Sequence, residues 1–133
     1  MTQSYKIFLK RESRYFLNRP AIKKMVEDFL KKQKVTGRVE VSLAVVGDRK
    51  MRELNLKYRQ IDEVTSVLAF PQELCGRRNE FVNPPDKVLR LGDIVISYPQ
   101  AVMLAAQENK LVGQKIEDLV EHGLRNLLGL NEI

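Results

Sequence analysis

The chain has 133 residues, of which 44% are hydrophobic and 30% are charged, so it is long enough for one domain with a sizeable core. No hydrophobic run reaches membrane-spanning length, and charged residues interrupt the N-terminal segment too early for a secretory signal. Cys75 is the single cysteine, which excludes a disulfide framework and a paired-cysteine metal knuckle. We therefore expect a single domain over residues 1–133, in a reducing, cytoplasmic setting and without a membrane segment.

The net charge of +6 is concentrated in the N-terminal third of the chain. Residues 1–40 contain eleven Lys and Arg against four Asp and Glu, which leaves the remainder close to neutral. A basic segment of this kind indicates a polyanionic partner, with nucleic acid as the first candidate. A solvated basic helix face is the alternative explanation.

Strand and helix patterns alternate through the first half of the chain. Residues 4–10 alternate weakly and predict a strand, and a helix with one apolar stripe opens near Pro20. Residues 38–45 alternate regularly and predict a second strand. Asp48 is expected to cap the helix that follows, with Asn55 at the edge of the core.

The second half predicts two further strands and two helices. Residues 65–70 read as a third strand, and residues 71–87 as a long polar loop that includes Cys75. Residues 88–97 read as a fourth strand, in which Gly92 indicates a bulge or a close backbone approach.

The last two helices complete a β-α-β-α-β-β-α-α order. One is expected from Tyr98 to near Asn109, and the other from Gly113 to a break at Gly129. The first two strands should pair in parallel and the last two antiparallel. This order predicts an α+β fold, a single domain with one mixed four-stranded sheet covered by helices.

The C-terminal stretch holds the only histidine of the chain, His122. Asn126 lies four residues later and shares a helix face with it. Glu132 follows the break at Gly129 and could fold back toward that face. A helix with a returning segment is the geometry of a metal site, but an imidazole, an amide and a carboxylate make a weak set of ligands for zinc.

Four stretches keep a common order and spacing across residues 39–132. They are LNLKYR within 51–59, DEVTSVLAFP at 62–71, LGDIVIS at 91–97 and the terminal HGLRNLLGLNE. They resemble the LNxxYR helix, the DxxTDVLSFP and LGDIxIS strands and the HGxLHLxGxDH motif of the YbeY family. That family comprises bacterial ribosomal-RNA maturation endoribonucleases, and the chain is identified as a divergent member.

The resemblance implies a metal site whose residues have changed. In the family motif three histidines bind a metal, taken to be zinc. His122 occupies the first position, whereas Asn126 and Glu132 stand at the second and third. Ser66 and Ala69 replace the Asp and Ser of the TDVLS segment.

Three states of this predicted metal site remain open. It could bind zinc, it could hold a weak or exchangeable ion such as Mg²⁺ or Ca²⁺, or it could hold no metal, with His122 a hydrated residue beside a cleft.

Two arginines are the candidates for RNA binding. The family's arginine at the position of Arg59 lines the cleft and is implicated in RNA processing, and a guanidinium suits a scissile phosphate, so Arg59 is also the candidate catalytic residue. The alternative is a structural role for Arg59 at the helix end, paired with Asp62 or helix carbonyls. Arg125, near the altered ligand positions, is a candidate phosphate anchor.

The resemblance implies a single-strand-specific, metal-dependent endoribonuclease of ribosomal-RNA maturation and ribosome quality control. The alternative is a catalytically impaired protein of the same fold that binds RNA or the ribosome, and a hydrolase with another substrate is a third possibility. The implied partners are ribosomal RNA and the small ribosomal subunit, with no membrane. The sequence does not determine the oligomeric state, and a monomer is the expectation.

Overall fold

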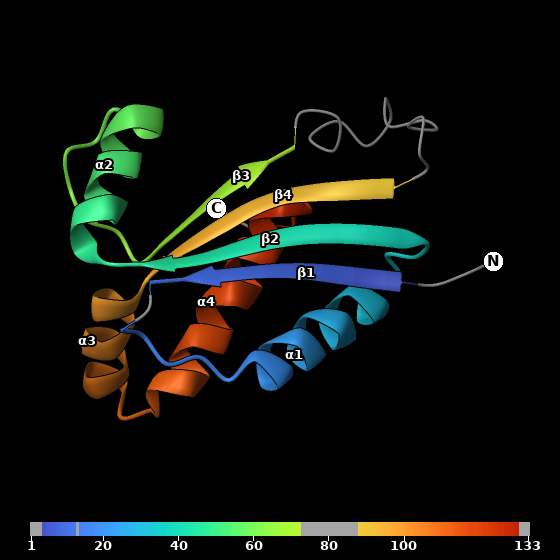
Figure 1. The fold of residues 1–133 in the computed structure, drawn as a ribbon, viewed down its shortest axis with the longest axis horizontal. Coiled ribbons are helices and arrows are strands. Elements are labelled where there is room, and N and C mark those ends of the chain that lie inside the picture. Colours follow the sequence, from blue (N-terminus) through green and yellow to red (C-terminus); the bar gives the residue numbers. More distant parts are fainter. Residues whose placement is uncertain (1–3, 13, 73–87, 131–133) are drawn as a thin grey trace.

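A computed structural model describes residues 4–12, 14–72 and 88–130 (Figure 1). The predicted loop with Cys75 falls almost wholly outside these residues, and so does Glu132. The element order is the one expected from the sequence: β1 Ser4–Arg11, α1 Arg19–Lys32, β2 Arg38–Val46, α2 Asp48–Arg59, β3 Val67–Pro71, β4 Val88–Ser97, α3 Tyr98–Glu108 and α4 Val112–Leu127.

The strands form one mixed sheet in the order β1-β2-β4-β3. β1 pairs with β2 and β2 pairs with β4 in parallel, whereas β3 is an antiparallel edge strand on β4. Both pairing expectations are therefore confirmed. The chain runs from β2 through α2 to the edge strand β3 and returns as β4, the last strand, which lies between β2 and β3.

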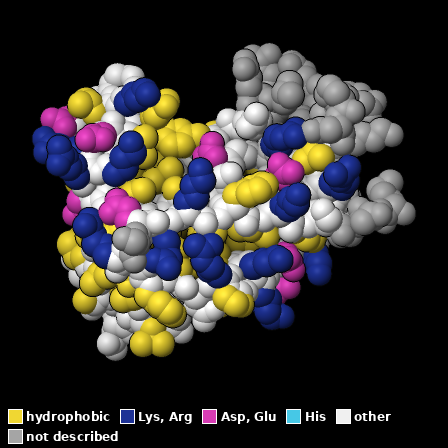
Figure 2. Space-filling model, viewed as in Figure 1, with side chains coloured by type: hydrophobic (Ala, Val, Ile, Leu, Met, Phe, Trp, Pro, Cys, Tyr) yellow, Lys and Arg dark blue, Asp and Glu magenta, His cyan; other side chains and the backbone are white. Residues whose placement is uncertain are grey.

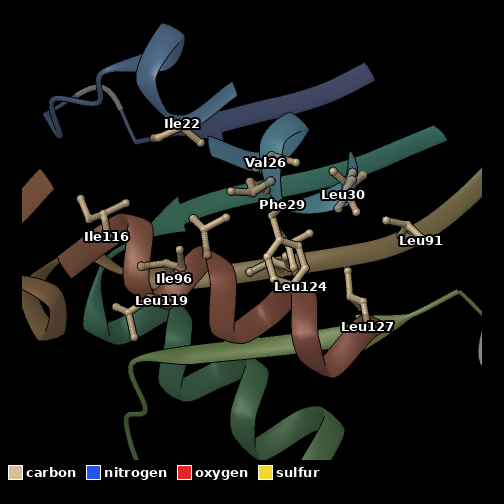
Figure 3. Packing of buried hydrophobic residues seen from close by; sticks show 14 of the residues in the cluster. Ile22, Val26, Phe29, Leu30, Leu91, Ile96, Ile116, Leu119, Leu124 and Leu127 are labelled. Atoms are coloured by element: carbon tan, nitrogen blue, oxygen red, sulfur yellow. The ribbon is translucent and has the colours of Figure 1, made fainter. Parts of the chain in front are cut away.

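One face of the sheet carries the main hydrophobic core. The alternating residues of β2 that include Val41 and Leu43 point to this face and meet the apolar stripes of α1 and α4. Figure 3 shows side chains of the two helices facing each other over β4. These stripes are Ile22, Val26, Phe29 and Leu30 from α1, and Ile116, Leu119, Val120, Leu124 and Leu127 from α4.

The opposite face is covered in part by α2, which Figure 1 shows on the other side of the sheet from α1 and α4. Met51 of α2 packs on Leu68 of β3 and Val95 of β4 in a small second cluster. This smaller cluster leaves the β1 side of the same face without a covering helix among the described elements, and a groove lies there.

Gly92 makes the close approach that its position in a strand indicated. Its φ is +135°, and a Cβ atom there would lie 2.3 Å from the carbonyl oxygen of Phe70. The β2–β4 register shifts beside it, between Glu40 and Ser42. A residue with a side chain would force β3 away from β4 at this point.

Two local expectations for α2 are wrong. Gly47, not Asp48, is the N-cap. The Asp48 carboxylate instead accepts hydrogen bonds from Ser97 Oγ (2.8 Å) and Gln100 Nε2 (3.3 Å), which joins the start of α2 to the start of α3. Asn55 is not at the core edge but 2% exposed, and its side-chain amide nitrogen donates to the carbonyl oxygen of Glu63 at 2.9 Å.

Among the residues that the structure describes, no helix is long and apolar enough to cross a membrane.

Candidate functional site

α4 positions His122 by burying the two residues that follow it. Gly123 and Leu124 are buried, and a Cβ atom on Gly123 would lie 2.7 Å from Cγ2 of Ile94 on β4. This turn of α4 therefore lies directly on the sheet. His122, next to the contact, is exposed, and Asn126 one turn later is half-buried.

The described residues do not form the metal site of a three-histidine motif. His122 and Asn126 lie on one helix and four residues apart, as predicted, but they offer one imidazole and one neutral amide. No group of three or more His, Cys, Asp and Glu that could hold a metal occurs among residues 4–12, 14–72 and 88–130. This donor set does not fit tetrahedral zinc. The part predicted for Glu132 stays a prediction.

Arg125 is engaged with its own helix and with α1. Its Nε donates to Glu121 Oε2 at 3.2 Å, one turn earlier, and its guanidinium lies 5.4 Å from the ring centroid of Phe29. These contacts turn Arg125 toward α1. Glu121 and Arg125 are four residues apart, the spacing of an ion pair on a helix, so the sequence already indicated this contact. Its role as a phosphate anchor stays a prediction.

Arg59 is the last residue of α2, and it is exposed. Asp62, the carboxylate considered as its partner, binds Arg52 instead, with distances of 2.6 Å from Nε to Oδ1 and 3.1 Å from Nη2 to Oδ2. The hydrogen bonds from Arg52 lower the pKa of the Asp62 carboxyl. Arg59 makes no ion pair with any residue in the described part of the chain.

The edge strand β3 lies between the helices that carry Arg59 and His122. On one face of β3, Tyr58 of α2 packs on Phe70 with ring centroids 5.0 Å apart. On the other face, α4 packs against β3 and β4. Arg59 and His122 thus come from opposite layers, and a substrate that touched both would have to pass around this edge of the sheet.

Comparison with known proteins identifies the family of this fold and of these residues. Residues 9–133 match the family model described as "Endoribonuclease YbeY". The chain belongs to the YbeY family. A YbeY endoribonuclease from Dehalococcoides mccartyi (strain ATCC BAA-2266 / KCTC 15142 / 195) is 34% identical over 129 residues, which cover 92% of this chain and 74% of the relative.

A second YbeY relative agrees with this assignment, and a solved structure shares the fold. The Roseiflexus sp. (strain RS-1) endoribonuclease is 35% identical over 114 residues, covering 86% of this chain and 70% of its own length. The solution structure of TM1509 from Thermotoga maritima superposes with a TM-score of 0.58 at 22% identity, over 92% of this chain and 72% of that one. At this identity the likeness concerns the fold alone.

Ser66 and Ala69, in the segment that resembles the TDVLS motif, make structural contacts within the sheet. The carbonyl oxygen of Ser66 accepts a hydrogen bond from Ser97 N at 2.9 Å, and Ala69 pairs with Ile94 in the β3–β4 register. Ala69 packs against the main core beneath α4. Neither residue supplies a carboxylate, so the described site has no acidic group at these two positions to direct a water molecule.

Proposed function

We propose that this chain acts on single-stranded ribosomal RNA during ribosomal-RNA maturation, as an endoribonuclease of the YbeY family. The observation that carries the proposal is the family match over residues 9–133, together with the four-stranded sheet and helix order of the fold. The proposed setting is the small ribosomal subunit in the cytoplasm, with a part in ribosome quality control.

The charges of the described residues support a phosphate-bearing substrate. Arg59 is exposed beside the edge strand β3, and its guanidinium is not neutralised by a described carboxylate. A guanidinium in this state can donate two parallel hydrogen bonds to a phosphate group. The net charge of +6 adds a long-range attraction for RNA.

A second candidate function is RNA or ribosome binding without cleavage. The observation that favours it is the donor set at His122 and Asn126, which does not fit a zinc site. A weakly held divalent ion, or none, would leave the chain able to bind RNA while water activation is lost or slow. In this second function, His122, Asn126 and Glu132 do not bind zinc.

One experiment separates the two functions. Tag-free protein is incubated with single-stranded ribosomal RNA in EDTA, Zn²⁺ or Mn²⁺, and cleavage and binding are measured on the same samples. Metal-dependent cleavage supports the endoribonuclease, whereas binding without cleavage supports the second function. Absence of both contradicts the proposal. Binding should weaken linearly in a plot of log K against log salt concentration, because phosphate contacts release counterions.

Arg59 is tested by Arg59→Ala with Arg49→Ala as the matched control. Both arginines are exposed on α2, but Arg49 lies in its first turn and faces Glu53 at 3.9 Å. Loss of one charge-assisted phosphate contact should weaken RNA binding about 10- to 150-fold, since such a bond contributes about 1.5–3 kcal/mol. Equal binding by the two variants would show that Arg59 does not hold the phosphate.

A further inference from the structure

A groove of about 540 Å³ lies on the face of the sheet that α2 covers only in part. α2 forms one wall through Leu54 and Tyr58, and β1 forms the other through Phe8 and Lys10. In Figure 2, hydrophobic side chains gather in the hollow between α2 and the strands, with Lys and Arg side chains beside it. The size is that of a site for a small organic group.

The strand register brings the groove residues into one row. Phe8 on β1 is the partner of Ser42 on β2, Ser42 is the partner of Asp93 on β4, and Asp93 is the partner of Phe70 on β3. Paired residues point to the same face of a sheet. The row therefore runs across the whole sheet with an aromatic ring at each end.

The aromatic rings of the groove are unusually exposed for their size. Phe8 is 45% exposed and Tyr58 is 53% exposed. Tyr58 is held in place by Phe70, with ring centroids 5.0 Å apart and planes at 56°. The rings of Phe8 and Tyr58 are therefore partly exposed to solvent, and flat heteroaromatic groups stack on exposed rings of this kind.

The charges divide the groove into a rim and a floor. Lys10 lines the β1 wall. Lys57 does not line the groove, but its Nζ lies 5.1 Å from the ring centroid of Tyr58, which does. Neither lysine makes an ion pair within the described residues. The exposed carboxylate of Asp93 lies in the floor between them. It repels phosphates from the floor and can accept hydrogen bonds from exocyclic amino groups of bases.

We propose that this groove binds unpaired nucleobases of single-stranded RNA, which stack on Phe8 and Tyr58 while Lys10 and Lys57 contact the flanking phosphates. The inference rests on the proposed function, because it extends the RNA-binding surface from Arg59 across the sheet. It assigns the recognition of single strands to this face, since a base in a duplex has no free surface to offer to Phe8 or Tyr58.

The test uses Phe8→Ala and Tyr58→Leu, with Phe16→Ala as the matched control. Phe16 is an exposed phenylalanine (78%) that lies outside this groove. The probes are a fluorescent 12-nucleotide single-stranded RNA and an abasic strand of equal length. Each groove variant should bind the RNA about 5- to 150-fold more weakly, the loss expected for one stacking ring, and the affinity of the control variant should not change. The abasic strand should bind the wild type and the three variants with equal affinity.

A second measurement does not depend on the stability of the groove variants. The chain has no tryptophan, so Phe8→Trp introduces a single fluorescent reporter in the groove and Phe16→Trp one outside it. Single-stranded RNA should quench the first reporter and leave the second unchanged, whereas the abasic strand should quench neither.

The outcomes separate this inference from the proposed function. RNA binding that is equal in wild type, Phe8→Ala and Tyr58→Leu, with no quenching of Phe8→Trp, overturns the groove and leaves the proposed function standing. Absence of RNA binding by the wild-type chain overturns both. Weaker binding of RNA by the groove variants, confined to strands that contain bases, supports the groove.

Discussion

Gly123 of α4 lies directly against Ile94 of β4, so closely that a Cβ atom on the glycine would come within 2.7 Å of Cγ2 and 2.9 Å of Cγ1 of the isoleucine. Both residues are buried, and Ile94 is fully enclosed by the core. The methyl-branched carbon of Ile94 cannot swing away without moving its neighbours. This contact sets the distance between α4 and the sheet, and therefore the position of His122 beside it.

Gly123→Ala should destabilise the protein although alanine favours helices. Overpacking costs about 1–3 kcal/mol, and the helix preference of alanine returns about 1 kcal/mol, so the net loss should be up to about 2 kcal/mol. Urea unfolding measures it. Gly113→Ala on the same helix is the control: nothing lies within 4 Å of its added Cβ, so stability should rise by up to about 1 kcal/mol. A rise in both variants would contradict the close contact.

Gly92→Ala should cost more than Gly37→Ala, although both glycines have positive φ. At Gly92 the new Cβ would meet the Phe70 carbonyl oxygen at 2.3 Å, whereas at Gly37 nothing lies within 4 Å. We expect losses of about 2–5 kcal/mol and about 1–2 kcal/mol respectively, because only the first adds a backbone clash to the strain. Thermal unfolding of the two variants compares them, and equal losses would show that β3 does not press on β4 at this bulge.

Arg52→Gln should raise the pKa of Asp62, because the guanidinium hydrogen bonds that lower it are lost. The folded-state pKa lies below its ordinary value of 3.8, so the bridge contributes stability above that value, and the contribution disappears as the pH falls through the folded pKa. Carboxyl chemical shifts against pH measure the change. Arg49→Gln, which touches Glu53 instead, should leave the Asp62 titration as it is.

Asn126→His should create a zinc site from a position that now supplies an amide. The variant would place two imidazoles four residues apart on one face of α4, the spacing with which a helix chelates zinc. Zinc content of tag-free protein and calorimetric titration should both rise above wild type. The gain should vanish in His122→Ala/Asn126→His. Stoichiometric zinc in the wild-type protein, lost in His122→Ala, would show instead that the present residues already form a site.

The periodicity of hydrophobic residues was sufficient to predict the order of strands and helices. It did not predict the contacts of side chains that have two possible partners. The alternation of residues 38–45 and the apolar stripe of α4 each have one compatible structure, and both were predicted correctly. Asp62 could have paired with Arg59 or Arg52, and only the path of the chain after α2 brings Arg52 to it. Phe8 is an aromatic residue between Lys6 and Lys10 on the solvent side of β1, where a polar residue is expected. This exception indicated a binding surface on that face, but the alternation of residues alone does not show what the surface is.

The sequence by itself determined the family and the order of strands and helices, because each depends on the local spacing and type of residues. Only the tertiary structure decided which residues meet. Insertion of β4 between β2 and β3 aligns Phe8, Asp93 and Phe70 in one row, and the layers on either face of β3 place Arg59 and His122 on opposite sides. Such long-range contacts depend on strand register and packing, which cannot be read from any short stretch of the sequence.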